Sequence, residues 1–188
     1  MRESVRGAMK KKLRTLICLI LIWLLAVPAW GEVVPAVTAE AAVVMDMDTG
    51  QVLYGKREHE RRPPASLTKV MTGYLAVKQK ELQQVVTVTE TAAETGESSL
   101  NLKAGDQLTF ANLLHGALMK SANDACVALA EHMAGSEETF VQNMNLQACL
   151  LGCANTNFKN SNGLPAEDHY SSAYDLAVMT RAAMQNEI

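Results

Sequence analysis

Apolar residues at helical spacing begin close to Ser66 and predict the first helix of the chain. They fall three or four positions apart along one stripe, formed by Leu67, Val70, Met71, Tyr74 and Leu75. Such a stripe is typical of a helix that buries one face against a core. Pro63 and Pro64 stand just before it, and the restricted backbone around proline disfavours an earlier start.

Two helices separated by a polar break are predicted farther along. Thr109 can cap the first of them, whose apolar side carries Leu113, Leu114, Ala117 and Leu118. Residues 119–123 interrupt the pattern, and residues 125–134 resume it. This break predicts a corner between consecutive helices.

Capping residues predict two more helices near the C-terminal end. Ser136, followed by two glutamates, starts a helix that ends at Gly152. Ser172 opens a capping-box pattern and, with it, the last predicted helix. Residues 155–169 between these helices are polar and are predicted to form a loop.

Short β-prone runs precede and interrupt this helical pattern. Residues 42–48 and 51–54 lie on either side of a Thr-Gly pair and predict a hairpin. Residues 85–89 predict another short strand. The chain is therefore expected to form a hairpin followed by a mostly helical body.

Residues 1–31 have the pattern of an export signal. Six basic residues precede an uncharged apolar run at residues 16–27, and small residues offer cleavage after Gly31 or after Ala39. The run is shorter than the roughly 20 residues of a membrane span, so a cleaved signal is predicted rather than an anchor. The remaining residues 32–188 are expected on the outer face of the cytoplasmic membrane, in the periplasm or in the cell wall. Any contact with the membrane surface is expected only through parts absent from this chain.

Charge and size narrow the classes of function. The whole chain has a net charge of −3, and residues 1–31 hold six basic residues and one acidic residue, so the remainder carries −8. No dense basic stretch is left to bind nucleic acid. About 157 residues suffice for one hydrophobic core, which indicates a single domain.

No metal or cofactor is predicted from the sequence. Cys126, Cys149 and Cys153 are odd in number and lack CxxC spacing, so small core residues are favoured over a disulfide or a metal site. The four histidines form no HExxH pair.

Ser66 and Lys69 carry the first candidate chemistry. Three residues apart in a helix, they lie on one face, with the amine within reach of the serine oxygen. Free backbone N–H groups at a helix start favour a serine alkoxide, and burial would make Lys69 lose its charge and act as a base. The pair suits acyl transfer through a serine ester. The S-x-x-K spacing alone decides little, because about half of chains of this length contain it by chance.

Ser121 and Asn123 form the second candidate cluster, at the predicted corner between helices. The hydroxyl can relay a proton, and the amide can both donate to and accept from a peptide. Ser99 and Asn101 have the same spacing, but they lie in an apparent surface loop and are less favoured. The alternative interpretation of the corner pair is that it only caps the following helix.

Taken together, these segments resemble the serine-type D-alanyl-D-alanine carboxypeptidases, the low-molecular-mass penicillin-binding proteins of peptidase family S11. The resemblance runs from about residue 41 to the last residue, and its segments are residues 48–50, 52–54, 64–69, 121–125, 128–131, 144–145, 151–152, 155–158, 160–164 and 173–177. It implies an α+β fold of the penicillin-binding/β-lactamase type, with a helical subdomain and an antiparallel sheet.

The resemblance also implies a role for each matched site residue. Ser66 would attack the carbonyl between the two terminal D-alanines of a peptidoglycan stem peptide, and Lys69 would accept its proton. Ser121 would pass that proton to the departing D-alanine, and Asn123 would hold the substrate backbone. β-Lactams would acylate Ser66 as covalent inhibitors, and no cofactor is implied.

One motif of the resembled family is missing from the chain. No Lys-Thr-Gly follows Asn123, and the sequence stops at Ile188 inside a predicted helix, with no Gly or Pro to end it. The chain is therefore expected to be a C-terminally truncated part of a catalytic domain. Its hairpin would keep an open edge and an uncovered apolar face, so poor folding and little activity are expected.

Two other functions stay open at this point. A β-lactamase-like hydrolase would share Ser66, Lys69, Ser121 and Asn123, but it needs a carboxylate beside the acyl-enzyme for deacylation, and the matched segments favour the carboxypeptidase. A non-catalytic, wall-associated fragment is the alternative that the missing motif suggests.

Overall fold

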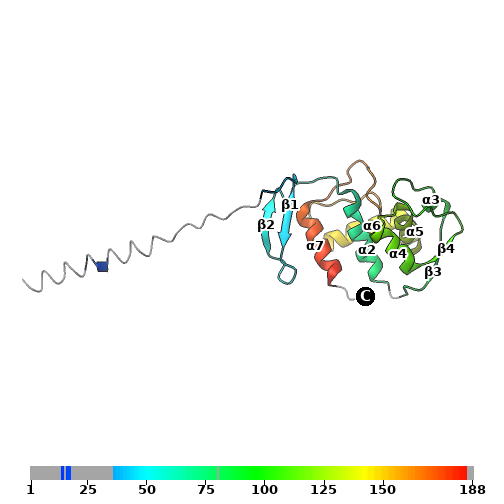
Figure 1. Ribbon diagram of the computed structural model, residues 1–188, viewed down its shortest axis with the longest axis horizontal. Coiled ribbons are helices and arrows are strands. Elements are labelled where there is room, and N and C mark those ends of the chain that lie inside the picture. Colours follow the sequence, from blue (N-terminus) through cyan, green and yellow to red (C-terminus); the bar gives the residue numbers. More distant parts are fainter. Residues whose placement is uncertain (1–13, 15, 18–35, 80, 186–188) are drawn as a thin grey trace, which may run out of the picture. The chain divides into compact units, whose positions relative to one another are not determined.

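A computed structural model describes most of the chain, namely residues 14, 16–17, 36–79 and 81–185 (Figure 1). The chain divides into two units, residues 1–37 and residues 38–188. In the first unit, Arg14, Leu16 and Ile17 are helical and exposed. The rest of the apolar run of the predicted export signal, and its cleavage site at Gly31, lie outside the described residues. Among the helices that the structure describes, none is long and apolar enough to cross a membrane.

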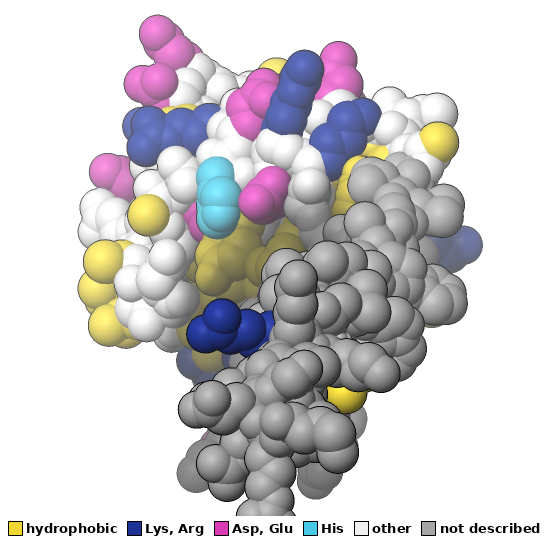
Figure 2. Space-filling model, turned by 90° about the vertical axis from the view of Figure 1, so that its left-hand side faces the viewer, with side chains coloured by type: hydrophobic (Ala, Val, Ile, Leu, Met, Phe, Trp, Pro, Cys, Tyr) yellow, Lys and Arg dark blue, Asp and Glu magenta, His cyan; other side chains and the backbone are white. Residues whose placement is uncertain are grey.

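Two antiparallel strands, β1 (Ala42–Met45) and β2 (Val52–Lys56), form the predicted hairpin. The helix α7 (Ala173–Met184) packs against β1 (Figure 1). Val44 and Leu53 of the hairpin are 51% and 63% exposed. Figure 2, which views the molecule from the hairpin side, shows hydrophobic side chains among charged ones on this face. The hairpin is confirmed, and part of its apolar surface is exposed in the described structure.

The turn of the hairpin is fixed to the helical body by hydrogen bonds. The Asp46 carboxylate closes the turn by accepting from the amide and hydroxyl of Thr49, at 2.8 and 2.6 Å. Arg181 of α7 donates to the main-chain carbonyls of Met47 and Asp48, both at 2.7 Å. The hairpin is thus attached to α7 through its turn as well as through β1.

Four helices form the body that holds the site: α2 (Lys69–Val77), α4 (Phe110–Met119), α5 (Asn123–Ala134) and α6 (Glu137–Leu150). The helix α5 contacts each of the other three (Figure 1). Every residue from position 123 to position 130 is buried, and the alanines among them let neighbouring helices approach closely. Because residues 123–130 are covered on all sides, the apolar residues in this part of α5 are not confined to one stripe.

Two clusters of buried side chains fill this body. The first lies around α4 and α5, and its largest fully buried members include Phe110, Leu113 and Leu129. The second joins α2, α6 and α7 through Met71, Phe140, Met144, Phe158 and Met179. Each fully buried side chain of this size contributes about 1.5–3 kcal/mol. The clusters therefore fix how the helices that carry the site cross one another.

Three predicted capping residues are confirmed. Thr109, Ser136 and Ser172 each place a side-chain oxygen where it accepts a hydrogen bond from the main-chain N–H three residues on. The caps satisfy N–H groups that a helix start leaves without partners. The predicted starts of α4, α6 and α7 therefore agree with the structure.

A second small sheet pairs β3 (Val85–Thr87) with β4 (Gln107–Thr109), and the short helix α3 (Glu90–Ala93) follows β3. The strand predicted at residues 85–89 is confirmed, ending two residues earlier than expected. The sequence did not predict β4 and α3, because three or four residues are too few to show a period.

Three details of the predictions are wrong. Ser66 lies in a 3₁₀ helix, η1 (Ala65–Thr68), rather than in the first turn of an α-helix. Leu67 and Leu118 are 57% and 48% exposed, so neither belongs to a buried stripe. For Leu67 the reason is geometric, since a 3₁₀ turn holds about 3.0 residues instead of 3.6 and rotates the side chains before α2 away from the stripe. Cys149 is exposed and is not a core residue.

The loop between α6 and α7, residues 151–172, closes over η1. Near its end, main-chain hydrogen bonds of 2.8 and 2.9 Å join Ser171 to Arg62, just before η1. A Cβ atom at Gly163 would lie 1.9 Å from the carbonyl oxygen of Ala65. The φ angle of Gly163, +94°, also favours glycine. Only glycine therefore lets the loop press against the backbone that precedes Ser66.

Replacement of Gly163 by alanine is expected to destabilise the protein more than the same change at Gly135. Gly135 has a similar φ of +80° and open space around an added Cβ, so Gly135→Ala should cost roughly 1–2 kcal/mol for its left-handed backbone alone. Gly163→Ala adds the clash and should lower the free energy of unfolding by more than about 3 kcal/mol. Urea denaturation measures both, and equal losses would show that the loop does not press on η1.

Candidate active site

Four side chains from two separate segments meet at the start of α2. Lys69 Nζ lies 3.3 Å from Ser66 Oγ and 2.8 Å from Asn123 Oδ1. Ser121 Oγ lies 3.1 Å from Ser66 Oγ. Ser66 is exposed, whereas Lys69 and Asn123 are each only 4% exposed. The structure thus brings together the four residues that the sequence singled out, with the serine open to solvent and the amine buried.

The hydrogen bonds of Lys69 fix the direction of its amine. Besides Asn123, the main-chain carbonyl of Asn162 accepts a hydrogen bond from Nζ, at 2.7 Å. A neutral amine has two N–H donors and one lone pair, and these two acceptors can take both donors. The lone pair then faces Ser66 Oγ, which is the arrangement that a base needs in order to accept the hydroxyl proton.

Burial sets the ionisation of Lys69. It lowers the pKa of this amine from the ordinary value of 10.5, while Cys126 and Glu97 oppose the change. Burial also raises the pKa of the Cys126 thiol to about 12, so this thiol carries no charge in the range where Lys69 titrates. Glu97 is therefore the charged neighbour that limits the drop. The lowered pKa gives Lys69 a larger neutral fraction than an exposed lysine would have.

Ser121 occupies a strained corner between α4 and α5. Its φ of +56° lies in the left-handed region. The N–H of Ala122 reaches back six residues to the Gly116 carbonyl at 3.2 Å, so the chain turns sharply after α4. Glycine is usual at such a left-handed position just beyond a helix end, where Ser121 stands. Ala122 is the N-cap of α5 and no side chain caps it, so the interpretation of Ser121 as a cap is wrong. A serine held in this conformation, 3.1 Å from Ser66 Oγ, is a candidate for a functional role.

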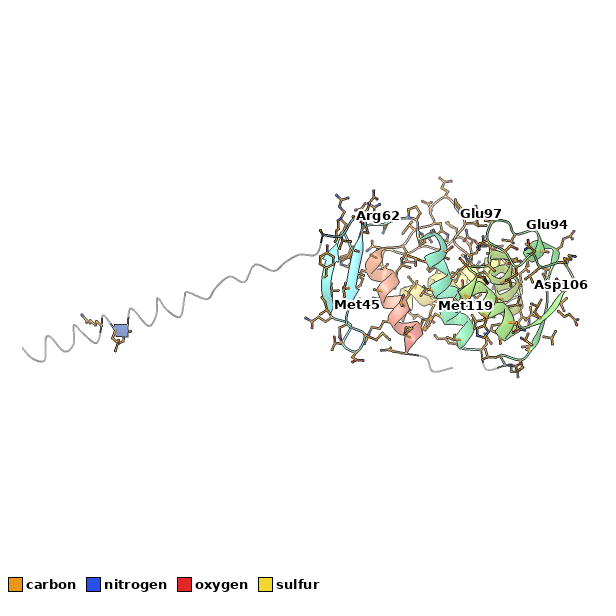
Figure 3. The ribbon with its side chains drawn as sticks, viewed as in Figure 1. Met45, Arg62, Glu94, Glu97, Asp106 and Met119 are labelled. Carbon is orange, nitrogen blue, oxygen red and sulfur yellow. The ribbon has the colours of Figure 1, made fainter. Side chains whose placement is uncertain are left out.

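Asn123 also holds the loop that approaches the site from α3. Its side-chain N–H donates to the Gly96 carbonyl at 3.0 Å, and its main-chain N–H donates to the Ser98 carbonyl at 2.7 Å. Glu97 lies between these anchors, on the connection from α3 to β4 (Figure 3), with a φ of +64°. The two hydrogen bonds therefore keep Glu97 in an unfavourable backbone conformation, from which its charge acts on Lys69.

The alternative pair, Ser99 and Asn101, has a structural role instead. Ser99 Oγ donates to the buried Asp124 carboxylate at 2.6 Å. The same carboxylate accepts hydrogen bonds from the main-chain N–H groups of Leu100 and Leu102. Ser99 thus helps to fold the loop onto α5 and makes no hydrogen bond to Ser66 in the described structure.

Residues 160–163 belong to the site, although the sequence did not place them there. Asn160 Oδ1 accepts a hydrogen bond from the Gly163 N–H at 2.7 Å and closes a tight turn, and this turn presents the Asn162 carbonyl to Lys69. The Asn-Ser-Asn-Gly composition predicts a turn. A main-chain carbonyl has no signature of its own in a sequence, so this partner of Lys69 could not be identified.

Buried His169 links the same loop to η1. Its Nδ1 accepts a hydrogen bond from the Lys159 N–H at 3.1 Å, so Nε2 carries the proton and donates to Thr68 Oγ1 at 2.9 Å. Burial lowers the pKa of His169 and favours this neutral form. The histidine therefore acts in packing the loop against η1.

Among the described residues, no three His, Cys, Asp or Glu side chains lie close enough together to hold a metal ion.

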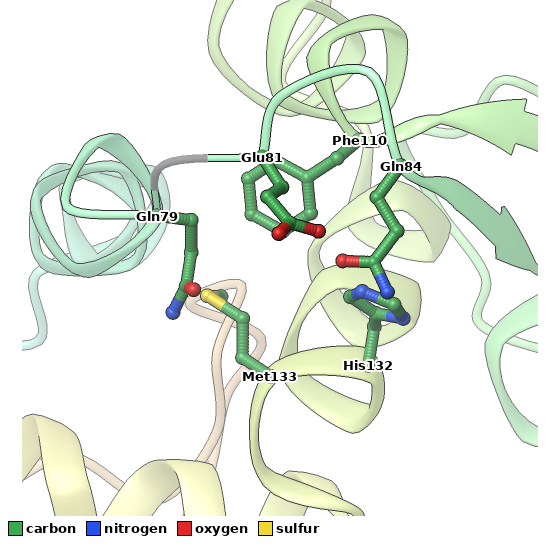
Figure 4. Close-up of a pocket in the computed structure, with 6 residues that line it drawn as sticks. All are labelled: Gln79, Glu81, Gln84, Phe110, His132 and Met133. Carbon is green, nitrogen blue, oxygen red and sulfur yellow. The ribbon is translucent and has the colours of Figure 1, made fainter.

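A pocket of about 200 Å³ opens at the C-terminal end of α2, away from Ser66 (Figure 4). It is lined by Gln79, Glu81, Gln84, Phe110, His132 and Met133.

Comparison with known proteins identifies a family. Residues 29–188 match the family model of D-alanyl-D-alanine carboxypeptidase, peptidase S11. The chain is 44% identical over 154 residues to the D-alanyl-D-alanine carboxypeptidase DacF of Bacillus subtilis, and 41% identical over 164 residues to DacD of Escherichia coli. These alignments cover 79% and 81% of this chain, but 40% and 42% of the relatives. The chain therefore spans about two fifths of the length of the curated relatives it matches.

Solved structures share the fold. The D-alanyl-D-alanine carboxypeptidase DacD of Francisella tularensis is similar with a TM-score of 0.79 at 37% identity, over 81% of this chain and 38% of that one. A D-alanyl-D-alanine carboxypeptidase of Mycobacterium tuberculosis gives a TM-score of 0.79 at 34% identity, over 85% and 61%. The expected α+β fold of the penicillin-binding D-alanyl-D-alanine peptidases is confirmed.

Glu97→Gln is expected to lower the pKa of Lys69 further, because it removes a negative charge that favours the ammonium form. The Lys69 Cε resonance, followed through a pH titration by ¹³C NMR, measures this change directly. Glu94→Gln is the matched control, since Glu94 is exposed on the same connection (Figure 3) and is not among the groups that shift Lys69. An unchanged Lys69 titration in Glu97→Gln would contradict the assignment.

Proposed function

Because the chain belongs to the D-alanyl-D-alanine carboxypeptidase family, peptidase S11, we propose that it is a serine-type carboxypeptidase that removes the terminal D-alanine from peptidoglycan stem pentapeptides. The observation that carries this proposal is the hydrogen bonding of Lys69. Nζ donates to Asn123 Oδ1 and to the Asn162 carbonyl and lies 3.3 Å from Ser66 Oγ. In the neutral amine these two acceptors take both N–H donors, which leaves the lone pair to face Ser66. The pair is thereby arranged as nucleophile and base.

Acylation begins with proton transfer from Ser66 Oγ to Lys69 Nζ. The serine oxygen attacks the carbonyl carbon between the two terminal D-alanines, and a tetrahedral adduct forms. The main-chain N–H of Ser66, at the start of the helix, donates to the negative oxygen of this adduct. Asn123 holds the substrate backbone and keeps Lys69 in place at the same time.

Collapse of the adduct breaks the bond to the leaving nitrogen, which must gain a proton. Ser121 lies 3.1 Å from Ser66 Oγ and passes the proton from Lys69 to the departing D-alanine. Water then attacks the ester on Ser66 and releases the shortened peptide. A β-lactam follows the same path as far as the ester, and it therefore acts as a covalent inhibitor.

The place of action follows from the substrate. Residues 1–31 direct export of the protein, and residues 32–188 act outside the cytoplasmic membrane, where peptidoglycan stem peptides are found. The negative charge of this part of the chain supports the exclusion of nucleic acid as a partner.

Labelled penicillin tests the proposal against the low activity expected of a chain without the Lys-Thr-Gly motif. Mass spectrometry of tryptic peptides is expected to place the adduct on Ser66, and Ser66→Ala should abolish it. A peptide ending in D-Ala-D-Ala should lose one D-alanine in the same preparation. Rapid hydrolysis of the penicillin without D-alanine release would support a β-lactamase-like enzyme instead. Absence of both reactions would support a non-catalytic, wall-associated fragment and reject the carboxypeptidase.

The Ser121→Gly variant distinguishes the effect of losing the hydroxyl from the effect of the strained backbone. Glycine suits the left-handed corner, so this variant should gain about 1 kcal/mol in free energy of unfolding. It loses the proton relay, so release of D-alanine should fall roughly 100-fold or more. Ser121→Ala, which loses the hydroxyl but keeps the strain, should be equally slow and less stable than Ser121→Gly. A fully active Ser121→Gly enzyme would contradict the relay.

A further inference from the structure

A carboxylate on α6 holds the turn that contacts Lys69. Glu137 Oε1 accepts two hydrogen bonds from Ser161, one from its main-chain N–H at 2.9 Å and one from its hydroxyl at 2.6 Å. Ser161 is fully buried. Glu137 is 24 residues away in sequence and belongs to a different element, the first turn of α6. The contact therefore ties the turn at residues 160–163 to the helical body.

A second hydrogen bond fixes Ser161 from the other side. Its main-chain carbonyl accepts from Thr72 Oγ1 at 2.5 Å, and Thr72 lies on α2, one turn after Lys69. The next carbonyl along the chain, that of Asn162, accepts from Lys69 Nζ at 2.7 Å. Ser161 is thus held by α6 through its N–H and hydroxyl, and by α2 through its carbonyl.

We propose that Glu137 is a positioning residue for the reaction, which sets the direction of the Asn162 carbonyl through Ser161 and thereby the direction of the Lys69 lone pair. This inference rests on the proposed function, because it gives Lys69 the role of base. Glu137 does not touch Lys69 or Ser66 in the described structure. It acts only through the turn that it anchors.

The physical reason lies in the freedom of a neutral amine. With Asn123 as the one remaining acceptor, Nζ can rotate and point an N–H group, rather than its lone pair, at Ser66 Oγ. The Asn162 carbonyl removes that freedom, and a carbonyl in a tight turn keeps its direction only if the turn is anchored. The nearby Asn160 side chain shapes the turn from within, whereas Glu137 joins it to the rest of the protein.

Loss of the contact between Glu137 and Ser161 should slow acylation and should also lower the pKa of Lys69. Misdirection of the base slows acylation, and displacements of this size typically cost on the order of 10-fold to 100-fold. The Asn162 carbonyl also stabilises the ammonium form more than the neutral form, so its withdrawal lowers the pKa of Lys69. The acid limb of the pH–rate profile should therefore move to lower pH while the plateau rate falls.

The test compares variants of the full chain by the rate of penicillin acylation across pH. Glu137→Ala should acylate roughly 10-fold to 100-fold more slowly, with the acid limb at lower pH. Glu137→Gln keeps the acceptor oxygen that makes both contacts and should restore most of the rate. Ser161→Ala keeps the main-chain contact to Glu137 and should lose less than Glu137→Ala.

Glu138→Ala is the matched control. Glu138 stands in the same first turn of α6 and has the same favourable position relative to the helix dipole, but it is exposed and makes no hydrogen bond to Ser161. This variant should acylate within about twofold of the wild-type rate. This control distinguishes the contact between Glu137 and Ser161 from the general effect of an acidic residue at a helix start.

Two results would overturn the inference. One is a wild-type rate and pH profile in Glu137→Ala. The other is a loss of rate that only follows the loss of folded protein, measured by urea denaturation, with the acid limb unmoved. If the wild-type protein is not acylated at all, the proposed function fails, and the Lys69 titration by ¹³C NMR then decides the inference separately. A lower Lys69 pKa in Glu137→Ala supports the proposed role of Glu137 in positioning the Asn162 carbonyl, and an unchanged pKa rejects that role.

Discussion

The buried amine of Lys69 is the constraint on which the rest of the site depends. An ammonium group inside a protein loses its hydration and is costly unless hydrogen-bond partners replace it. Here the partners are an amide oxygen, a main-chain carbonyl and a hydroxyl. Neutral oxygens stabilise the charged form less than a hydrogen-bonded carboxylate would, so burial dominates and the pKa of Lys69 is lowered. The same hydrogen bonds that offset the cost of burying the amine also direct it at Ser66.

The backbone around Lys69 shows how much the fold is adapted to this arrangement. Ala65 and Ser121 both have positive φ angles, +48° and +56°, directly beside the nucleophile and at the helix corner. Such conformations persist only where the surroundings enforce them. The surroundings here are the buried helix α5 and the loop that presses Gly163 against Ala65. Helix packing and loop closure thus supply the force that keeps two strained residues at the site.

Local chemistry made part of this structure predictable. The helix starts at Thr109, Ser136 and Ser172 follow from caps that act over three residues, and Ser66 and Lys69 face each other because of helical spacing. The Asn162 carbonyl was beyond prediction, since it comes from the main chain of a loop far along the sequence. The exposure of Leu67 depends on a single 3₁₀ turn, which leaves no periodic trace in the sequence.

The positions of the hydrogen atoms on Lys69 Nζ show whether this amine is neutral and directs its lone pair at Ser66. A neutron structure at about pH 10, where a lysine of ordinary pKa would still be mostly protonated, locates them. A neutral Lys69 that acts as the base should carry two deuterium atoms on Nζ, directed at Asn123 Oδ1 and at the Asn162 carbonyl, with one deuterium on Ser66 Oγ directed at Nζ. Three deuterium atoms on Nζ, with one pointing at Ser66 Oγ, would contradict this role of Lys69.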